Sequence, residues 1–534
     1  MVKRELLPRF VSASTAASIL FIGRSLNHIR VKGIVSGSSL GLQSPHLHLL
    51  SSLSFPVTSS DLSSIISAIR LSLSQSTLQK LLPISRILEL LTLLYNYFLL
   101  GRGEFAIALI NEADERIRSR WRRPDNLAYD RRDRLSDIVL KDGEVLAVLS
   151  RTWVTMAALQ SANDDDDDQL ELARDLIHLS ISKGSPPETP DKYPSSEKTQ
   201  LSNPIVSTPF RSLLLSVPTD LTLRIPSPLD LFLTPSEVQT YSVINAYLLS
   251  IRRAHLRLTD LWKITSLRRH HPAPLAPPYG SSAAGQIVVK KFRFRARDRE
   301  KKLRSVWATS SAALFLLGEM ETYFQGEVVQ GTWSGFQQWL TGPLCRSATG
   351  TSDGLHRDAL AKATRHSHDW QALSDSHRRY LDSLTHNLLL RNPSFTDPLY
   401  HLLQQIDQLV ALVNRIHLIW QSLDLENDEG VVDAFTDFHK EEKDIGKQLD
   451  ATAGCVKEAI EFLIQSLRDI DQEKENMYNT VLDSMHDGMA YVPFKISRVD
   501  RLLMKLDFGG WFNVPKRDDE SDEHDSNCDE GNIM

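Results

Sequence analysis

The stretch TPSEVQTYSVINAYLLSIRRAHLRLTDLW, residues 234–262, decides the fold class. Thr234 is a typical N-cap, Pro235 suits the first helical position, and Glu237 follows the cap by three residues, as in a capping box. Apolar and aromatic side chains then recur every three or four positions, which predicts a long helix buried along one face. These side chains are Tyr241, Ile244, Leu248, Ile251, His255, Leu258 and Trp262.

Three further stretches show the same spacing and predict more long helices: residues 307–328, 399–420 and 456–467. Thr396, Asp397 and Pro398 mark the expected start of the second. Alternation typical of strands is scarce, and KFRFRAR (Lys291–Arg297) is the main candidate. The sequence therefore predicts an all-α fold of long antiparallel helices in consecutive helical bundles.

Polar segments interrupt these helices. One insertion, from about residue 160 to 205, contains the acidic run Asp164–Asp168 and a Pro/Ser-rich stretch, and a second lies near 270–290. Residues 516–534 form an acidic tail with almost nothing to bury. We expect these segments to be disordered.

Composition excludes several classes of protein. The formal net charge of −6 provides no global basic field for nucleic acid or anionic membranes. The three cysteines, Cys345, Cys455 and Cys528, form no CxxC pair and are too few for a disulfide framework. No uncharged apolar run reaches the roughly 18 residues of a membrane-spanning helix. We therefore expect no membrane insertion.

Motifs for catalysis are missing from the sequence. It contains no GxxxxGK[ST] phosphate loop and no H-E-x-x-H zinc helix. GSSLG (Gly37–Gly41) matches G-x-S-x-G, but no buried strand precedes it to hold the serine in a strained turn. The sequence thus predicts a protein that is not an enzyme and has no cofactor or metal.

The densest basic segment is Lys290–Arg304, which also carries Phe292 and Phe294. Basic residues interleaved with aromatic ones can bind single-stranded nucleic acid by stacking. The alternatives are a solvated entry to the next helix or a surface that faces an acidic protein. On a net acidic chain we predict a protein partner or none, and no nucleic acid.

The insert Gly101-Arg102-Gly103-Glu104 separates two apolar runs in YFLLGRGEFAIALI (residues 97–110). It lacks the lysine and hydroxyl of a phosphate loop. Gly101 is a plausible C-terminal cap, and Glu104 suits the first turn of the next helix. We interpret the insert as a bend between two helices, with Arg102 placed to pair with a neighbouring helix or a partner.

Six stretches, taken in order, resemble the family of gamma-tubulin complex components, also called spindle pole body components. Each motif alone is weakly specific, whereas their order along the chain is strongly so. They are LLPRFVSASTAASILFIGRSLNHIR, YFLLGRGEFAIALI, LDLFLTPSEVQTYSVINAYLLSIRRAHLRLTDLW, LRSVWATSSAALFLLGEMETYFQGEVV, DWQALSDSHRRYLDSL and LLMKLDFGGWF.

This resemblance implies two helical domains, an N-terminal one that packs against neighbouring components and a C-terminal one that binds gamma-tubulin. Residues 84–515 would form the C-terminal domain, and residues 1–83 only the last part of the N-terminal domain. By the same resemblance, roughly the first two hundred residues of a full member, about the size of one domain, would then be missing. The implied partners are gamma-tubulin and other complex components.

The function that the resemblance implies is templating of microtubule nucleation at a microtubule-organising centre or spindle pole body, in the cytoplasm and cytoskeleton. GTP would belong to the tubulin. The alternative is a helical tethering subunit of another complex, such as one that tethers vesicles, because long helical bundles occur in both.

The family motifs also suggest residues for the gamma-tubulin interface. Arginine and aromatic residues are enriched in protein interfaces, and Gly326 and Gly331 could interrupt a helix and expose its termini. For the aromatic candidates the alternative is core packing, and for the arginines it is a solvated face or pairing within the chain. The candidates are Arg252, Arg253, Tyr323, Gln325, Glu327 and Trp333.

Overall fold

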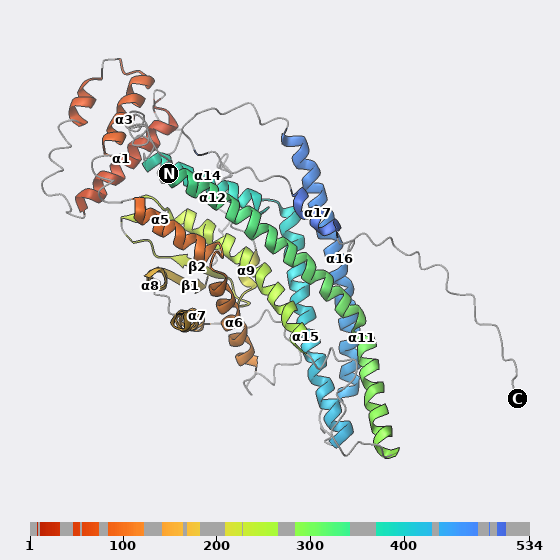
Figure 1. The fold of residues 1–534 in the computed structure, drawn as a ribbon. Coiled ribbons are helices and arrows are strands. Elements are labelled where there is room, and N and C mark those ends of the chain that lie inside the picture. The colour runs from red at the N-terminus through yellow and green to blue at the C-terminus, as the bar shows by residue number, and fades with distance from the viewer. Residues whose placement is uncertain are drawn as a thin grey trace, which may run out of the picture.

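The computed structural model consists mainly of long helices arranged around α9 (Pro235–Lys263), as Figure 1 shows. On one side of α9 lie the shorter helices α5 to α8 and a two-stranded sheet, and on the other side lie α11, α15 and α16. The all-α fold class is confirmed. The described residues are 8, 11–31, 46–53, 56–73, 84–121, 141–163, 168–181, 209–226, 228–264, 283–341, 370–429, 437–478, 491 and 499–508.

The helices before α9 are mostly short. The helices α1 and α3 contact each other at one end of the molecule in Figure 1, and Phe21 of α1 packs against the main hydrophobic core. A π-helical turn, η3, continues α5 toward α6. The bounds are α1 Ala13–Val31, α3 Ser59–Leu73, α5 Ile84–Leu93, η3 Leu94–Phe98, α6 Gly103–Trp121, α7 Asp142–Asn163 and α8 Asp168–Leu176.

Strands β1 (Ile177–Ile181) and β2 (Thr219–Leu223) form an antiparallel pair in which Ile177 faces Leu223 and Ile181 faces Thr219. Ile177 and Leu179 are buried while His178 and Ser180 are exposed, so the strand has one apolar face. That face packs toward α7 and α9. The short 3₁₀ turns η7 (Pro209–Ser212) and η8 (Leu229–Leu231) flank β2.

The second half of the chain forms the long bundle. In α15 and α16 the apolar side chains that recur every three or four positions are buried, and these two helices pack side by side along most of their length. These side chains are Leu399, Leu402, Ile406, Val410, Val413 and Trp420 of α15 and Val456, Ile460, Leu463 and Leu467 of α16. The bounds are α11 Ala283–Thr322, η9 Tyr323–Val329, α12 Gln330–Thr341, α14 Trp370–Asn387, α15 Pro393–Glu429, α16 Phe438–Tyr478 and α17 Asp500–Phe508.

The predicted start of α9 is confirmed. The helix begins at Pro235, and Thr234 and Glu237 form the capping box. The backbone N–H of Thr234 donates to Glu237 Oε2 at 2.8 Å, which pairs an N–H that would otherwise lack a partner at the helix end. By contrast, α15 begins at Pro393, five residues before the predicted start, and Pro398 lies inside it. Pro393 occupies the first helical position, where proline costs nothing.

The strand prediction for Lys291–Arg297 is wrong, because this segment lies inside α11. The basic residues of this segment recur at every second position, as in a strand, but this also places them four residues apart, as on one face of a helix. Arg295 and Arg299, four residues apart and thus on one helix face, both pair with Asp424 of α15, with Nη–Oδ1 distances of 2.9 and 2.8 Å. These tertiary contacts outweigh the strand propensity of the two phenylalanines.

The predicted insertions are shorter than expected. Residues 168–181, within the first insertion, form α8 and β1, where Ala173, Ile177 and Leu179 join the core. Residues 283–290 of the second insertion are the first turns of α11. The rest of these insertions, and the tail 516–534, lie outside the described residues.

The capping glutamate also links this start of α9 to α14. Glu237 is buried, Arg378 Nε donates to its Oε1 at 2.9 Å, and His377 Nδ1 lies 3.8 Å from its Oε2. Burial alone would raise the pKa of Glu237, but His377, the Thr234 N–H and Arg378 together lower it to about 2. The pKa of an unfolded glutamate is about 4.5.

We expect the carboxylate of Glu237 to stabilise the fold above pH 4.5, and this contribution to be lost as the pH falls toward 2. By pKa linkage Glu237→Gln lowers the free energy of unfolding at pH 7 by on the order of 2–3 kcal/mol. Urea unfolding at a series of pH values measures this difference, which shrinks in acid. The control is Asp142→Asn, an exposed first-turn acid on α7. A difference between wild type and Glu237→Gln that is independent of pH would contradict the prediction.

Candidate protein-interaction site

The insert at residues 101–104 lies at a bend of 45° between the helices on its two sides. The chain leaves η3 through Leu100, which has a φ of 57°, and α6 begins at Gly103. The left-handed residue is therefore Leu100 and not the expected Gly101. The N–H of Gly101 donates to the carbonyl of Tyr95 at 3.1 Å, and that of Arg102 to the carbonyl of Asn96 at 2.9 Å, so these bonds close the helix end.

Gly101 is required by close approach. A Cβ at this position would lie 2.5 Å from Tyr95 Cε1 and 3.0 Å from the Tyr95 carbonyl oxygen. The Tyr95 ring is held in turn by Trp333 of α12, with stacked ring centroids 5.0 Å apart. Arg102 donates from Nη1 to the Tyr97 hydroxyl at 3.3 Å. The insert is thus fixed to its surroundings.

A buried asparagine of α9 holds the other side of the bend. Asn245 Nδ2 donates to the carbonyl oxygens of Tyr97 and Phe98, at 3.2 and 3.0 Å. These carbonyls sit at the end of η3, where a helix leaves acceptors without partners. A buried acceptor left unpaired costs roughly 1–3 kcal/mol, so Asn245 fixes where α5 and η3 end.

A second π-helical turn, η9, lies inside the continuous helix formed by α11, η9 and α12. The sequence predicts that Gly326 and Gly331 interrupt this helix, whereas the backbone passes through both without a free end. Phe324, Val328 and Val329 of η9 are buried, while Gly326 is exposed and a Cβ there would meet nothing within 4 Å. π-helical turns inside α-helices occur frequently at functional sites.

The bend, α9 and η9 meet at one place. A hollow of about 10 Å³ is lined by Leu100, Leu248, Ile251, Glu321, Phe324 and Gln325. At its edge Glu321 pairs with both Arg252 and His255, and His255 Nδ1 lies 2.7 Å from Glu321 Oε2. Three of the family motifs therefore converge in space, although they are far apart in the sequence.

The predicted interface residues have different environments. Arg252 is partly exposed and paired with Glu321 on α11. Arg253 is only 4% exposed and points toward α6 and α15. Tyr323 and Trp333 are 2% and 7% exposed, so both pack in the core. Burial and the nearby Glu327 raise the pKa of Tyr323 to about 12, which keeps its hydroxyl protonated.

Gln325 and Glu327 are half-buried on η9 beside the exposed Gly326. Glu327 accepts a bond of 3.4 Å from Arg501 of α17, whose side chain is largely exposed. Of the predicted candidates, Arg252, Gln325 and Glu327 thus reach the surface. Their role at an interface stays a prediction.

Sequence reasoning missed the ion network around α9. Arg253 and Arg257 both pair with Asp114 of α6 and with Asp407 of α15. The Arg257 distances are 2.7 Å to each carboxylate. Burial opposes ionisation of Asp114, yet the two arginines hold its pKa below the usual value. The i,i+4 spacing of the arginines signals a shared face, but nothing in the sequence indicates the distant acids.

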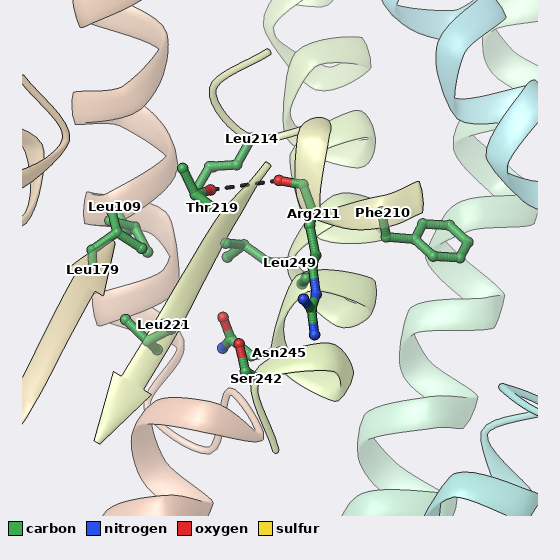
Figure 2. Close-up of a pocket in the computed structure, with 11 residues that line it drawn as sticks. Leu109, Leu179, Phe210, Arg211, Leu214, Thr219, Leu221, Ser242, Asn245 and Leu249 are labelled. Atoms are coloured by element: carbon green, nitrogen blue, oxygen red, sulfur yellow. Dashed lines mark hydrogen bonds between the residues drawn. The ribbon is translucent and has the colours of Figure 1, made fainter. Parts of the chain in front are cut away.

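The described residues offer little room for a small molecule. Figure 2 shows the cavity between α6, the sheet, η7 and α9, where Arg211, Ser242 and Asn245 converge and Thr219 donates to the Arg211 carbonyl. Its volume is about 20 Å³, enough for roughly one water molecule. Arg211 is already paired with Asp220, Nε to Oδ1 at 2.9 Å. We assign this cavity to packing.

No group of three or more His, Cys, Asp or Glu side chains in the described residues is placed to hold a metal ion. No single helix in them is long and apolar enough to span a membrane, and only the bent pair Ser85–Phe98 and Gly103–Arg118 reaches that length and composition jointly.

The two glycines of the insert provide a matched test of the bend. Gly101→Ala forces the new methyl group against Tyr95 and lowers the free energy of unfolding by about 1–3 kcal/mol, the range for overpacking. In Gly103→Ala nothing lies within 4 Å of the new Cβ, and the free energy of unfolding rises by up to about 1 kcal/mol because alanine favours the helix. Urea unfolding of the two variants measures both values. Equal effects would contradict the proposed role of Gly101.

A second pair of variants tests the ion network. Asp114→Asn leaves two arginines sharing Asp407, and we expect the free energy of unfolding to fall by on the order of 3 kcal/mol. The control is Asp260→Asn, which breaks the exposed pair with Lys263 and costs less than about 1 kcal/mol. Thermal or urea unfolding gives the difference. An Asp114→Asn effect no larger than the control would show that the network contributes little.

Comparison with known proteins identifies relatives of this chain. Two curated relatives, Gamma-tubulin complex component 4 of Mus musculus and of Homo sapiens, are each 25% identical, over 282 and 280 residues. Each alignment covers 50% of this chain and 36% of the relative. Both of these relatives bear the name of the fourth component, which the six motifs resemble.

A family model described as "Gamma tubulin complex component C-terminal" matches residues 87–512, well over half of the chain. This range contains the bend, α9, η9 and α17, which meet or adjoin in the structure. The chain therefore belongs to the gamma-tubulin complex component family.

Proposed function

We propose that this protein binds gamma-tubulin and acts as a non-catalytic component of a gamma-tubulin complex that templates microtubule nucleation. The observation that carries the proposal is the family match over residues 87–512. Residues 84–515 would be the gamma-tubulin-binding region, and residues 1–83 would contact other components of the complex. The protein would act at a microtubule-organising centre or spindle pole body.

The proposed mechanism requires a rigid platform and no bond-making chemistry. Several such components hold gamma-tubulins side by side, so that a microtubule grows from a preformed nucleus. Rigidity comes from α9, which the ion network ties to α6 and α15, and from the long packed helices α15 and α16. Family membership favours this role over the alternative of a vesicle-tethering subunit.

Within this proposal, the exposed side of η9 is the contact surface that we select. Gln325, Gly326 and Glu327 lie there, and Arg252 lies across the hollow beside Glu321. Polar side chains around a small depression fit the rim of a partly polar protein interface. Tyr323 and Trp333 would support this surface from beneath, since they are buried, whereas Arg253 faces α6 and α15.

The test is co-purification of gamma-tubulin with the full chain from a cell extract, followed by two glycine variants. Gly326→Arg adds a long charged side chain to an exposed site with open space, so the fold is kept while the surface is blocked. We expect retained gamma-tubulin to fall at least about tenfold, because an arginine that protrudes from the contact surface keeps the two proteins from packing against each other. Gly143→Arg, equally exposed and uncrowded on α7, is the control.

Two outcomes would contradict the proposal at different levels. If the wild-type chain retains no gamma-tubulin, the proposed function is wrong. If it does retain gamma-tubulin but Gly326→Arg and Gly143→Arg behave alike, only the choice of the η9 surface is wrong. A fluorescent fusion that gathers at membranes and not at spindle poles would favour the tether instead.

A further inference from the structure

The first turns of α11 carry a basic stripe, which we define as Lys290, Arg293, Arg297, Lys301 and Arg304. All five side chains are exposed. At 100° per residue they fall within about one third of the helix circumference and extend over about 21 Å. Two exposed apolar side chains share this face: Ile287 is 68% and Phe294 75% exposed.

The other face of the same turns is already occupied. Arg295 and Arg299 pair with Asp424 of α15, and Lys302 pairs with Glu442 of α16 at 3.1 Å. By contrast, no member of the basic stripe forms an ion pair with any acid in the part of the chain that the structure describes. The helix thus separates its cations into an inward set with partners and an outward set that faces solvent.

An acidic segment of the same chain has the complementary charge. Residues 518–530 contain eight acids, Asp518, Asp519, Glu520, Asp522, Glu523, Asp525, Asp529 and Glu530, and Ile533 and Met534 follow them. The only basic residues after α17 are Lys516 and Arg517, apart from His524. Opposite charge along two segments of similar length steers their association.

The connection is long enough for this contact. The helix α17 lies against α11, where Lys505 Nζ is 3.9 Å from Glu319 Oε2. From Glu319 to Arg304 and Lys290 the helix rises about 22 and 43 Å. Asp518 follows Phe508 by ten positions, a length of chain that spans up to about 33 Å when extended, and the later acids reach further. Being tethered, the segment is present at a high effective concentration.

We propose that the acidic segment 518–530 binds the basic stripe of α11 within the same molecule, with Ile533 and Met534 beside Phe294. This contact would screen the stripe from acidic surfaces of other proteins until such a surface displaces the segment. The inference is independent of the proposed function, since its test requires no gamma-tubulin.

The test is zero-length carbodiimide cross-linking of the full chain, which joins a lysine amine to a carboxylate in direct contact and releases water to the reagent. Mass spectrometry is expected to find residues 518–530 linked to Lys290 and Lys301. The triple variant Arg293→Glu, Arg297→Glu and Arg304→Glu keeps both lysines, yet we expect the yield of these links to fall at least about fivefold. In 1 M salt, where charges are screened beyond about 3 Å, the same loss is expected.

The matched control reverses three exposed basic residues elsewhere: Arg86→Glu, Arg118→Glu and Lys457→Glu. Its cross-links should equal those of wild type. A mixture of ¹⁵N-labelled and unlabelled chains distinguishes the source of each link. Links within one isotope only support the proposal, and mixed links would overturn it in favour of a second copy. Links spread evenly over all surface lysines, or none to α11, would also overturn it.

A second measurement does not depend on altering α11. A labelled peptide of residues 516–534 is titrated into the full chain and into a chain truncated after Pro515. Because the native segment competes, we expect the truncated chain to bind the peptide at least about fivefold more tightly. Equal affinities would overturn the proposal. Tighter binding of a single-stranded oligonucleotide than of the peptide would assign the stripe to nucleic acid instead.

Discussion

The pairing of Arg253 and Arg257 with Asp114 and Asp407 is the interaction on which the arrangement of the helices depends. Each arginine binds both carboxylates, so α6, α9 and α15 are joined at one point, where Arg253 and Asp114 are buried and Arg257 and Asp407 are partly buried. Buried charges are stable only in a fixed, fully paired geometry, which gives such a network directional control that apolar contacts lack. The apolar faces supply most of the driving force, and the charges select the relative position of the three helices.

The helices themselves were predictable from the sequence, because periodic burial leaves a direct signal in the residues. For α9 even the first residue was predicted, since Thr234 and Glu237 bond to local backbone groups. The prediction failed where distant residues decide. The segment Lys291–Arg297 lies inside α11, where Asp424, more than a hundred residues later, pairs with Arg295 and with Arg299 just beyond the segment. Likewise, β1 forms only by pairing with β2 across a long segment.

The candidate site was predictable in part, through the order of the family motifs. From the sequence, arginines and aromatic residues were selected because of their residue type. Residue type does not indicate which way a side chain points in the fold. Arg252 and Arg253 are neighbours, yet one faces Glu321 near the surface and the other faces the buried Asp114 of α6 and the partly buried Asp407 of α15. The same limit applies to Asn245. In the sequence nothing distinguishes it from other polar residues of a helix, and its bonds to the carbonyls of Tyr97 and Phe98 are visible only in the structure.

The π-helical turn η9 has a consequence for how this surface can change in evolution. A π turn accommodates one residue more than the α-helix around it, so α11 and α12 keep their packing on either side while the extra residue is accommodated locally. Removing one residue from Tyr323–Val329 would restore a regular helix without turning the flanking core faces away from their partners. A change in length of one residue is therefore tolerated at this point of a long buried helix. Elsewhere in the helix the same change would rotate every following side chain by about 100°.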